Sequence, residues 1–100
     1  MTKPLDIRPH DLAIVLQILQ GCLPAYAKVW VFGSRAKWTT KDSSDLDLAI
    51  DAGRPLKRNE QAELADAFEE SDLPYKVDIA DWHSISESFK EAISDRKSVV

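Results

Sequence analysis

Three aspartates in two strand-like stretches are the residues of this chain best suited to chemistry. Asp45 and Asp47 alternate at the start of the run 45–50, and Asp78 lies between two branched apolar residues in a later run. Alternate side chains of an extended strand point to the same face. Asp45 and Asp47 are therefore expected on one face, while the apolar residues that alternate with them pack on the other.

Carboxylates gathered in this way repel one another unless a cation neutralises them. Two unit charges about 4 Å apart cost roughly 4 kcal/mol at an effective dielectric near 20. Mg²⁺ prefers oxygen ligands, and in phosphoryl or nucleotidyl transfer two ions roughly 3.5 to 4 Å apart clamp the phosphate and help to deprotonate the attacking hydroxyl. Asp45, Asp47 and Asp78 match that demand, so we interpret them as a metal site.

The pair Gly33-Ser34 supplies the phosphate-binding half of such a site. A glycine lets the backbone approach a phosphate closely, and N–H groups that open a helix attract anions. The Ser34 hydroxyl adds a further donor, and Arg35 offers a planar fork to the same phosphates. Lys37 and Lys41 are weaker candidates that would act as point charges.

The predicted strands bring these residues to one edge of a sheet. The segment 28–32 is rich in β-branched and aromatic residues and ends at Gly33, which is typical of a buried strand followed by a tight turn. If the strand that begins at Asp45 runs antiparallel to it, Gly33 and the acids share one edge, and the connection is short enough to permit this. A third strand is predicted over 75–80, with Asp78 opposite its apolar side.

Apolar residues at helical spacing predict the helices that cover the sheet. The first helix is expected over about 9–21, wedged between the sheet and a neighbouring helix, and another over 60–70. Ser84 and Glu87 form a capping box for a further helix, and the tail 96–100 is too short to place. The predicted fold class is α+β, a small mixed β-sheet flanked by helices.

Other polar residues have simpler interpretations. Asp81 is the alternative to Asp78 as third acid, but alternation puts it on the other face of the strand. Asp51 is expected to be a solvated loop charge, and His83 has no partner at ligand spacing, so a zinc site is not expected.

Length and composition limit the kind of protein. One hundred residues, 44% of them hydrophobic and 30% charged, predict a single domain over 1–100 with one modest core. A formal charge of −4 argues against a general nucleic-acid-binding surface. No apolar stretch approaches the roughly 20 residues that span a bilayer, and the segment 1–8 lacks a signal peptide's apolar core. A cytoplasmic location is expected.

The spacing of Gly33-Ser34, Asp45-x-Asp47 and a later strand Asp78 resembles the nucleotidyltransferase superfamily that includes DNA polymerase β, particularly its minimal nucleotidyltransferase (MNT) branch. The resemblance implies that ATP binds through Gly33, Ser34 and two Mg²⁺ ions. It implies Asp45 and Asp47 as metal ligands and Asp78 as ligand and base. Attack on the α-phosphate would release pyrophosphate.

The resemblance also implies a partner. Small members of this family typically pair with a HEPN-domain protein, an all-helical ribonuclease toxin, and act as its antitoxin. The chain would then transfer AMP from ATP to a hydroxyl group of that toxin. The alternatives are an antitoxin that blocks its partner sterically without catalysis, and a nucleotidyltransferase that acts on RNA or on a small molecule. An oligomer, such as a dimer, could form the pocket for a small molecule.

Overall fold

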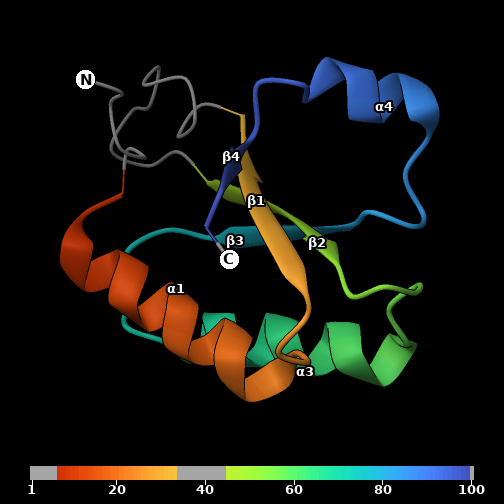
Figure 1. Ribbon diagram of the computed structural model, residues 1–100. Helices are drawn as coiled ribbons and strands as arrows, with labels where there is room; N and C mark the ends of the chain where they lie inside the picture. Colours follow the sequence, from red (N-terminus) through yellow and green to blue (C-terminus); the bar gives the residue numbers. More distant parts are fainter. Residues whose placement is uncertain (1–6, 34–44, 100) are drawn as a thin grey trace.

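The computed structural model describes residues 7–33 and 45–99. Its elements follow the chain in the order α1 (Pro9–Cys22), β1 (Lys28–Phe32), β2 (Leu46–Asp51), α3 (Arg58–Glu69), β3 (Val77–Asp81), α4 (Glu87–Ala92) and β4 (Lys97–Ser98). Figure 1 shows α1 and α3 side by side on one side of the sheet and α4 on the other side.

The four strands form one mixed sheet in the order β3-β2-β1-β4. β1 runs antiparallel to β2 and to β4, as predicted for the first pair, whereas β2 and β3 run parallel with α3 as the connection between them. A parallel pair needs such a crossover, while an antiparallel pair needs only a turn or loop. The predicted α+β fold with a mixed sheet and flanking helices is confirmed.

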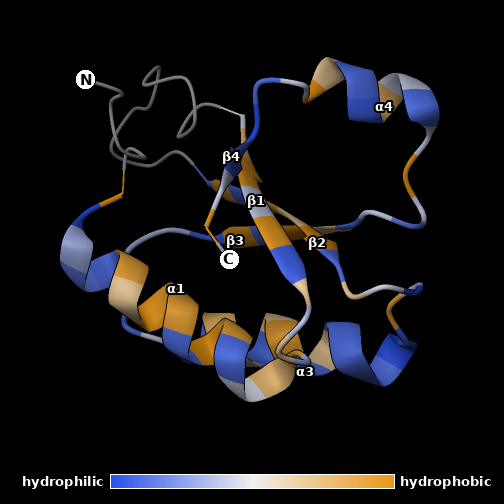
Figure 2. Ribbon diagram, viewed as in Figure 1, coloured by the Kyte–Doolittle hydropathy of each residue, from blue (hydrophilic) through white to orange (hydrophobic). Residues whose placement is uncertain are grey.

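The core lies between the sheet and the helix pair α1 and α3. Leu46, Leu48 and Ile50 are fully buried, as the alternation in β2 predicts. The helices contribute the buried side chains of Val15, Leu19, Leu64 and Phe68. Figure 2 shows the hydrophobic colour along the middle of α1 and over the strands. Full burial of one such side chain is worth about 1.5–3 kcal/mol, so this layer fixes the orientation of β2.

Aromatic side chains cover part of the other face of the sheet. Trp30 and Trp82 pack with their ring centroids 4.9 Å apart, and the Arg96 guanidinium lies over both rings, at 4.9 Å and 4.5 Å. Phe32 meets Phe89 of α4 edge to face at 5.7 Å. This second layer explains why Ala49, which points away from α1 and α3, is also buried.

Three local predictions differ from the structure. The third strand is Val77–Asp81 rather than 75–80. The tail 96–100, for which no element was predicted, contains β4, whose Ser98 pairs with Trp30 of β1. The cap of α4 is Ser86, which accepts a hydrogen bond from the Phe89 N–H at 3.1 Å. Ser84, the predicted cap, instead donates its hydroxyl to Asp81 at 2.8 Å.

Within residues 7–33 and 45–99, no helix combines the length and the apolar character needed to cross a membrane.

Candidate nucleotide and metal site

Asp47 and Asp78 occupy paired positions on adjacent strands. They are Cα partners in the parallel register of β2 and β3, and partners in a ladder point to the same face. That face is opposite the core, because the neighbours Leu46 and Leu48 are fully buried against α1 and α3. Asp45 is exposed immediately before β2. The fold therefore brings all three predicted acids to the same end of the β2–β3 pair.

The acids interact electrostatically. Partial burial of the Asp47 carboxyl raises its pKa above the ordinary value, and the negative charges of Asp78 and Asp45 raise that pKa further. Each of these causes disfavours the ionised form of a carboxyl group. The carboxylates of Asp78 and Asp45 are thus near enough to that of Asp47 to oppose its negative charge.

Gly33 lies directly against Asp47. Its φ is +75°, a conformation that glycine adopts without steric cost. A Cβ at this position would stand 2.6 Å from Asp47 Oδ2, closer than a Cβ comes to a neighbouring heavy atom. Phe32, the residue before it, pairs with Asp47 in the antiparallel register. A bare backbone turn and a carboxylate are therefore adjacent, as the sequence spacing predicts.

Four of the predicted phosphate-binding residues lie outside the described residues. They are Ser34 and Arg35, together with the weaker candidates Lys37 and Lys41. Their assignment stays a prediction.

Asp81 has a different task from Asp78. Its side chain is buried, and its oxygens accept hydrogen bonds from the N–H groups of Leu56 (3.0 Å) and His83 (3.1 Å) and from the Ser84 hydroxyl. The bond from Leu56 ties the end of β3 to the segment that leads into α3, and the other two stabilise the turn that follows β3. Asp81 lies on the core face, as strand alternation predicts, because it is the register partner of the core residue Ile50 and accepts from the core residue Leu56.

The donor chemistry of the site suits a divalent cation. Asp45 and Asp78 are exposed carboxylates beside the half-buried Asp47, and hard cations such as Mg²⁺ prefer such oxygens. In the described part of the chain, no three His, Cys, Asp or Glu side chains form a ready-made metal cluster. The fit thus rests on strand register and donor type.

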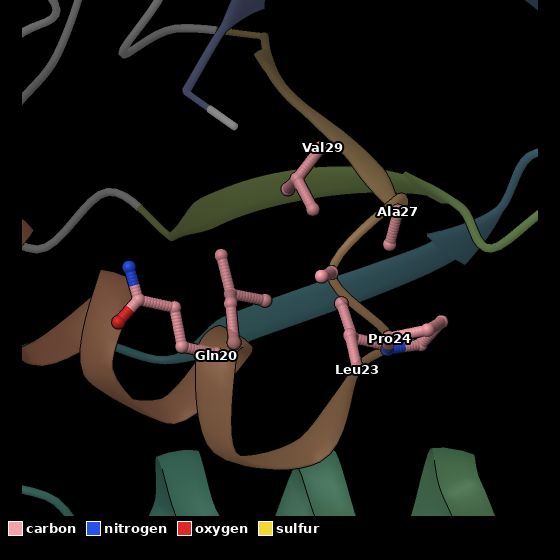
Figure 3. A pocket seen from close by; sticks show the side chains of 7 residues that line it. Gln20, Leu23, Pro24, Ala27 and Val29 are labelled. Atoms are coloured by element: carbon pink, nitrogen blue, oxygen red, sulfur yellow. The ribbon is translucent and has the colours of Figure 1, made fainter.

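The cavity in Figure 3 is a separate feature of the fold. It has a volume of about 380 Å³ and lies between the end of α1, the segment 23–27 and Val29 at the start of β1. Gly33 follows the opposite end of β1, so this cavity does not belong to the acid site.

Sequence reasoning missed two features on the sheet face that carries the acids. Asp51 is no solvated loop charge, since it ends β2 and its Oδ1 lies 2.6 Å from His83 Nε2. The contact between Phe32 and Phe89 was also missed. The position of Phe32, directly before the predicted glycine turn, was the one available signal for it.

Comparisons with known proteins agree with this geometry. The family described as "Polymerase beta, Nucleotidyltransferase" matches residues 11–100. The chain is 52% identical over 89 residues to the probable protein adenylyltransferase MntA of Haemophilus influenzae. The aligned region covers 89% of this chain and 77% of that protein.

Solved structures share the fold. A toxin–antitoxin crystal structure with AMP-PNP superposes with a TM-score of 0.75 at 25% identity, covering 90% of this chain and 73% of that one. A tri-AMPylated Shewanella oneidensis HEPN toxin in complex with an MNT antitoxin contains a similar chain, with a TM-score of 0.68, 22% identity and coverage of 89% and 68%.

Proposed function

The chain belongs to the polymerase β nucleotidyltransferase family, and on that premise we propose that it transfers AMP from ATP to a hydroxyl group of a partner toxin and thereby acts as an antitoxin. The observation that carries the proposal is the meeting of Asp47, Asp78 and Gly33 at one end of the β2–β3 pair. A single catalytic domain over residues 1–100 is part of the proposal, and so is a cytoplasmic location, where ATP is supplied.

In the proposed reaction, the hydroxyl oxygen of the acceptor attacks the α-phosphorus of ATP. A new P–O bond forms, the bond between the α-phosphorus and the bridging oxygen breaks, and pyrophosphate leaves. Asp78, which is exposed beside Asp47, accepts the proton of the attacking hydroxyl. The backbone turn at Gly33, together with Ser34 and Arg35, binds the phosphates.

Asp45, Asp47 and Asp78 would hold two Mg²⁺ ions. Bound there, the ions would neutralise phosphate charge and lower the pKa of the attacking hydroxyl. The raised pKa of Asp47, caused by partial burial and by the charges of Asp78 and Asp45, supports this role, because a site that concentrates negative charge gains most from a cation.

The partner is proposed from the relatives. The 52% identical protein is named a probable protein adenylyltransferase, so its acceptor is a protein. A chain of the same fold at 25% identity comes from a toxin–antitoxin complex with AMP-PNP. We take the acceptor of this chain to be a toxin of the HEPN type that the sequence resemblance implies.

The first experiment asks what the chain labels. The protein is added with Mg²⁺ to a lysate of its source cells with ATP labelled at the α-phosphate, and in parallel with ATP labelled at the γ-phosphate. Transfer of the α label alone into a protease-sensitive product supports AMP transfer to a protein. A nuclease-sensitive product would make RNA the acceptor instead.

Two variants make this experiment specific. Asp47→Asn removes a proposed ligand, whereas Asp51→Asn changes an aspartate on the same face at the other end of β2. Labelling should be lost in the first variant and retained in the second. No labelling by the wild-type protein, in a lysate shown to contain the unmodified toxin, would favour the steric antitoxin.

A further inference from the structure

An aromatic pair borders the acid site. Phe32 directly precedes Gly33 and is the register partner of Asp47. Such antiparallel partners have Cβ atoms about 4.5–5.5 Å apart. The ring of Phe89 meets the Phe32 ring edge to face, at 5.7 Å between centroids and 90° between planes. Phe89 thus contacts, from α4, the aromatic residue that pairs with Asp47. Helix α4 lies on the face of the sheet opposite α1 and α3 (Figure 1).

Phe89 is unusually exposed for a large apolar side chain. It is 37% exposed, and in the described part of the chain the other exposed large apolar side chain is Tyr26, at 68%. The Phe89 ring therefore contacts Phe32 at a right angle and keeps further surface open to solvent. A planar apolar surface beside a charged site is suited to a ligand that is itself flat on one side and charged on the other.

The backbone holds Phe89 in place. The N–H of Phe89 donates to the Ser86 hydroxyl oxygen at 3.1 Å, which caps α4. Its carbonyl accepts from the N–H of Ile93, a buried residue, at 3.1 Å. The next residue, Lys90, places its ammonium group 4.9 Å from the centroid of the Trp82 ring. The two backbone bonds fix the helical position of Phe89, and the Lys90–Trp82 contact holds α4 against the aromatic layer of the sheet.

We infer that the exposed surface of Phe32 and Phe89 binds the base of the nucleoside triphosphate; the inference rests on the function proposed above. Phe32 and Gly33 are consecutive residues. A nucleotide whose phosphates lie on the Gly33 turn therefore has an aromatic surface nearby on which its base can stack. Stacking on an aromatic side chain stabilises any nucleobase, because every base has a π-face. The aromatic ring of an acceptor side chain is the competing occupant.

The test compares two ligands that differ by the nucleoside. Titration calorimetry with Mg²⁺ measures the binding of ATP and of inorganic tripolyphosphate to the wild type, Phe89→Ala, Phe89→Tyr and Tyr26→Ala. Phe89→Ala should weaken ATP binding roughly 5- to 150-fold and leave tripolyphosphate binding unchanged. Phe89→Tyr should retain ATP binding, and Tyr26→Ala, which changes the other exposed ring, should behave as the wild type.

Four outcomes would overturn the inference. Equal weakening of both ligands by Phe89→Ala would mean that the ring supports the phosphate site rather than the base. If Phe89→Ala bound ATP normally but transferred AMP to the toxin more slowly, the Phe89 ring would instead contact the acceptor. If the wild type bound neither ligand, the proposed function would fail and the base site with it. If the wild type bound both ligands and Phe89→Ala bound ATP equally well, the base site alone would be overturned.

Discussion

The Oδ2 atom of Asp47 occupies the space in which a side chain on residue 33 would begin, since a Cβ on Gly33 would stand 2.6 Å from it. Gly33→Ala should therefore push the Asp47 carboxylate aside. The variant should also lose roughly 1–2 kcal/mol of unfolding free energy, because positive φ is unfavourable for a residue with a Cβ. Urea denaturation should show this lower free energy of unfolding, and Mg²⁺-dependent ATP binding should be lost.

The chain offers a matched control in Gly21, which lies in α1 with open space around its Cα. Gly21→Ala should leave ATP binding intact and change the free energy of unfolding by 0 to about 1 kcal/mol in the stabilising direction. Normal ATP binding by Gly33→Ala would contradict the contact with Asp47.

Removing the charge of Asp47 should stabilise the metal-free protein. Partial burial and the charges of Asp78 and Asp45 raise the pKa of Asp47, so its ionised form costs folding free energy at neutral pH. Asp47→Asn should raise the free energy of unfolding by up to about 1 kcal/mol after allowance for solvent screening. The measurement is thermal unfolding in EDTA.

The same variant should lose the effect of metal. Addition of Mg²⁺ should raise the melting temperature of the wild type, because a ligand that binds the native state stabilises it, but it should leave Asp47→Asn almost unchanged. A lower melting temperature for Asp47→Asn in EDTA would argue against a shared acidic cluster.

Acid stability should depend on Glu60. Its carboxylate accepts two hydrogen bonds from Arg54 (2.7 and 2.9 Å) and one from the Lys57 N–H (2.8 Å). These contacts lower the pKa of Glu60 from 4.5 to about 2, and the hydrogen bonds from Arg54 have a larger effect than the one from the Lys57 backbone.

A lowered pKa stabilises the fold above the unfolded value of about 4.3–4.5, and the contribution is lost as the pH falls towards 2. Glu60→Gln should therefore unfold at lower urea concentration than the wild type at pH 7, with the difference shrinking between pH 4.5 and pH 2. Glu63→Gln, on the exposed side of the same helix, is the control. A difference that persisted unchanged to pH 2 would refute the role of the Glu60 charge.

Arg96 should stabilise the aromatic layer. Its guanidinium lies over Trp30 and Trp82, and cation–π contacts of this kind are worth about 0.5–2 kcal/mol. Its Nε is buried without a hydrogen-bond partner among the described residues, which offsets part of that gain. Arg96→Met should cost about 1 kcal/mol in urea denaturation followed by tryptophan fluorescence, whereas Arg58→Met, at an exposed position, should cost under about 0.5 kcal/mol.

Strand alternation was enough to identify the acid-bearing face of β2. Leu46 and Leu48 point inward and Asp47 outward because one face of the strand must pack on the helices. The antiparallel pairing of β1 and β2 also followed, since a short connection joins them and Gly33 had to meet the acids.

The convergence of the three acids was predicted, but the exact strand registers and the contacts between distant elements were beyond the reach of the sequence. The pairing of Asp47 with Asp78 depends on the register of a parallel pair joined through α3, and local sequence does not set a register across a crossover. β4 has only two residues, Lys97 and Ser98, and so no periodicity to detect. The contact of Phe32 with Phe89 depends on where α4 packs and on where it begins, after the cap Ser86 rather than Ser84.

The central claim is that the chain joins AMP to a partner toxin, and mass spectrometry of the intact toxin tests it most directly. The purified toxin is incubated with ATP, Mg²⁺ and either the wild-type chain, Asp47→Asn or Asp51→Asn. The account predicts that the toxin gains one or more AMP groups with the wild type and Asp51→Asn, and none with Asp47→Asn. A toxin that keeps its mass yet is silenced equally by all three proteins would contradict the account and establish steric inhibition.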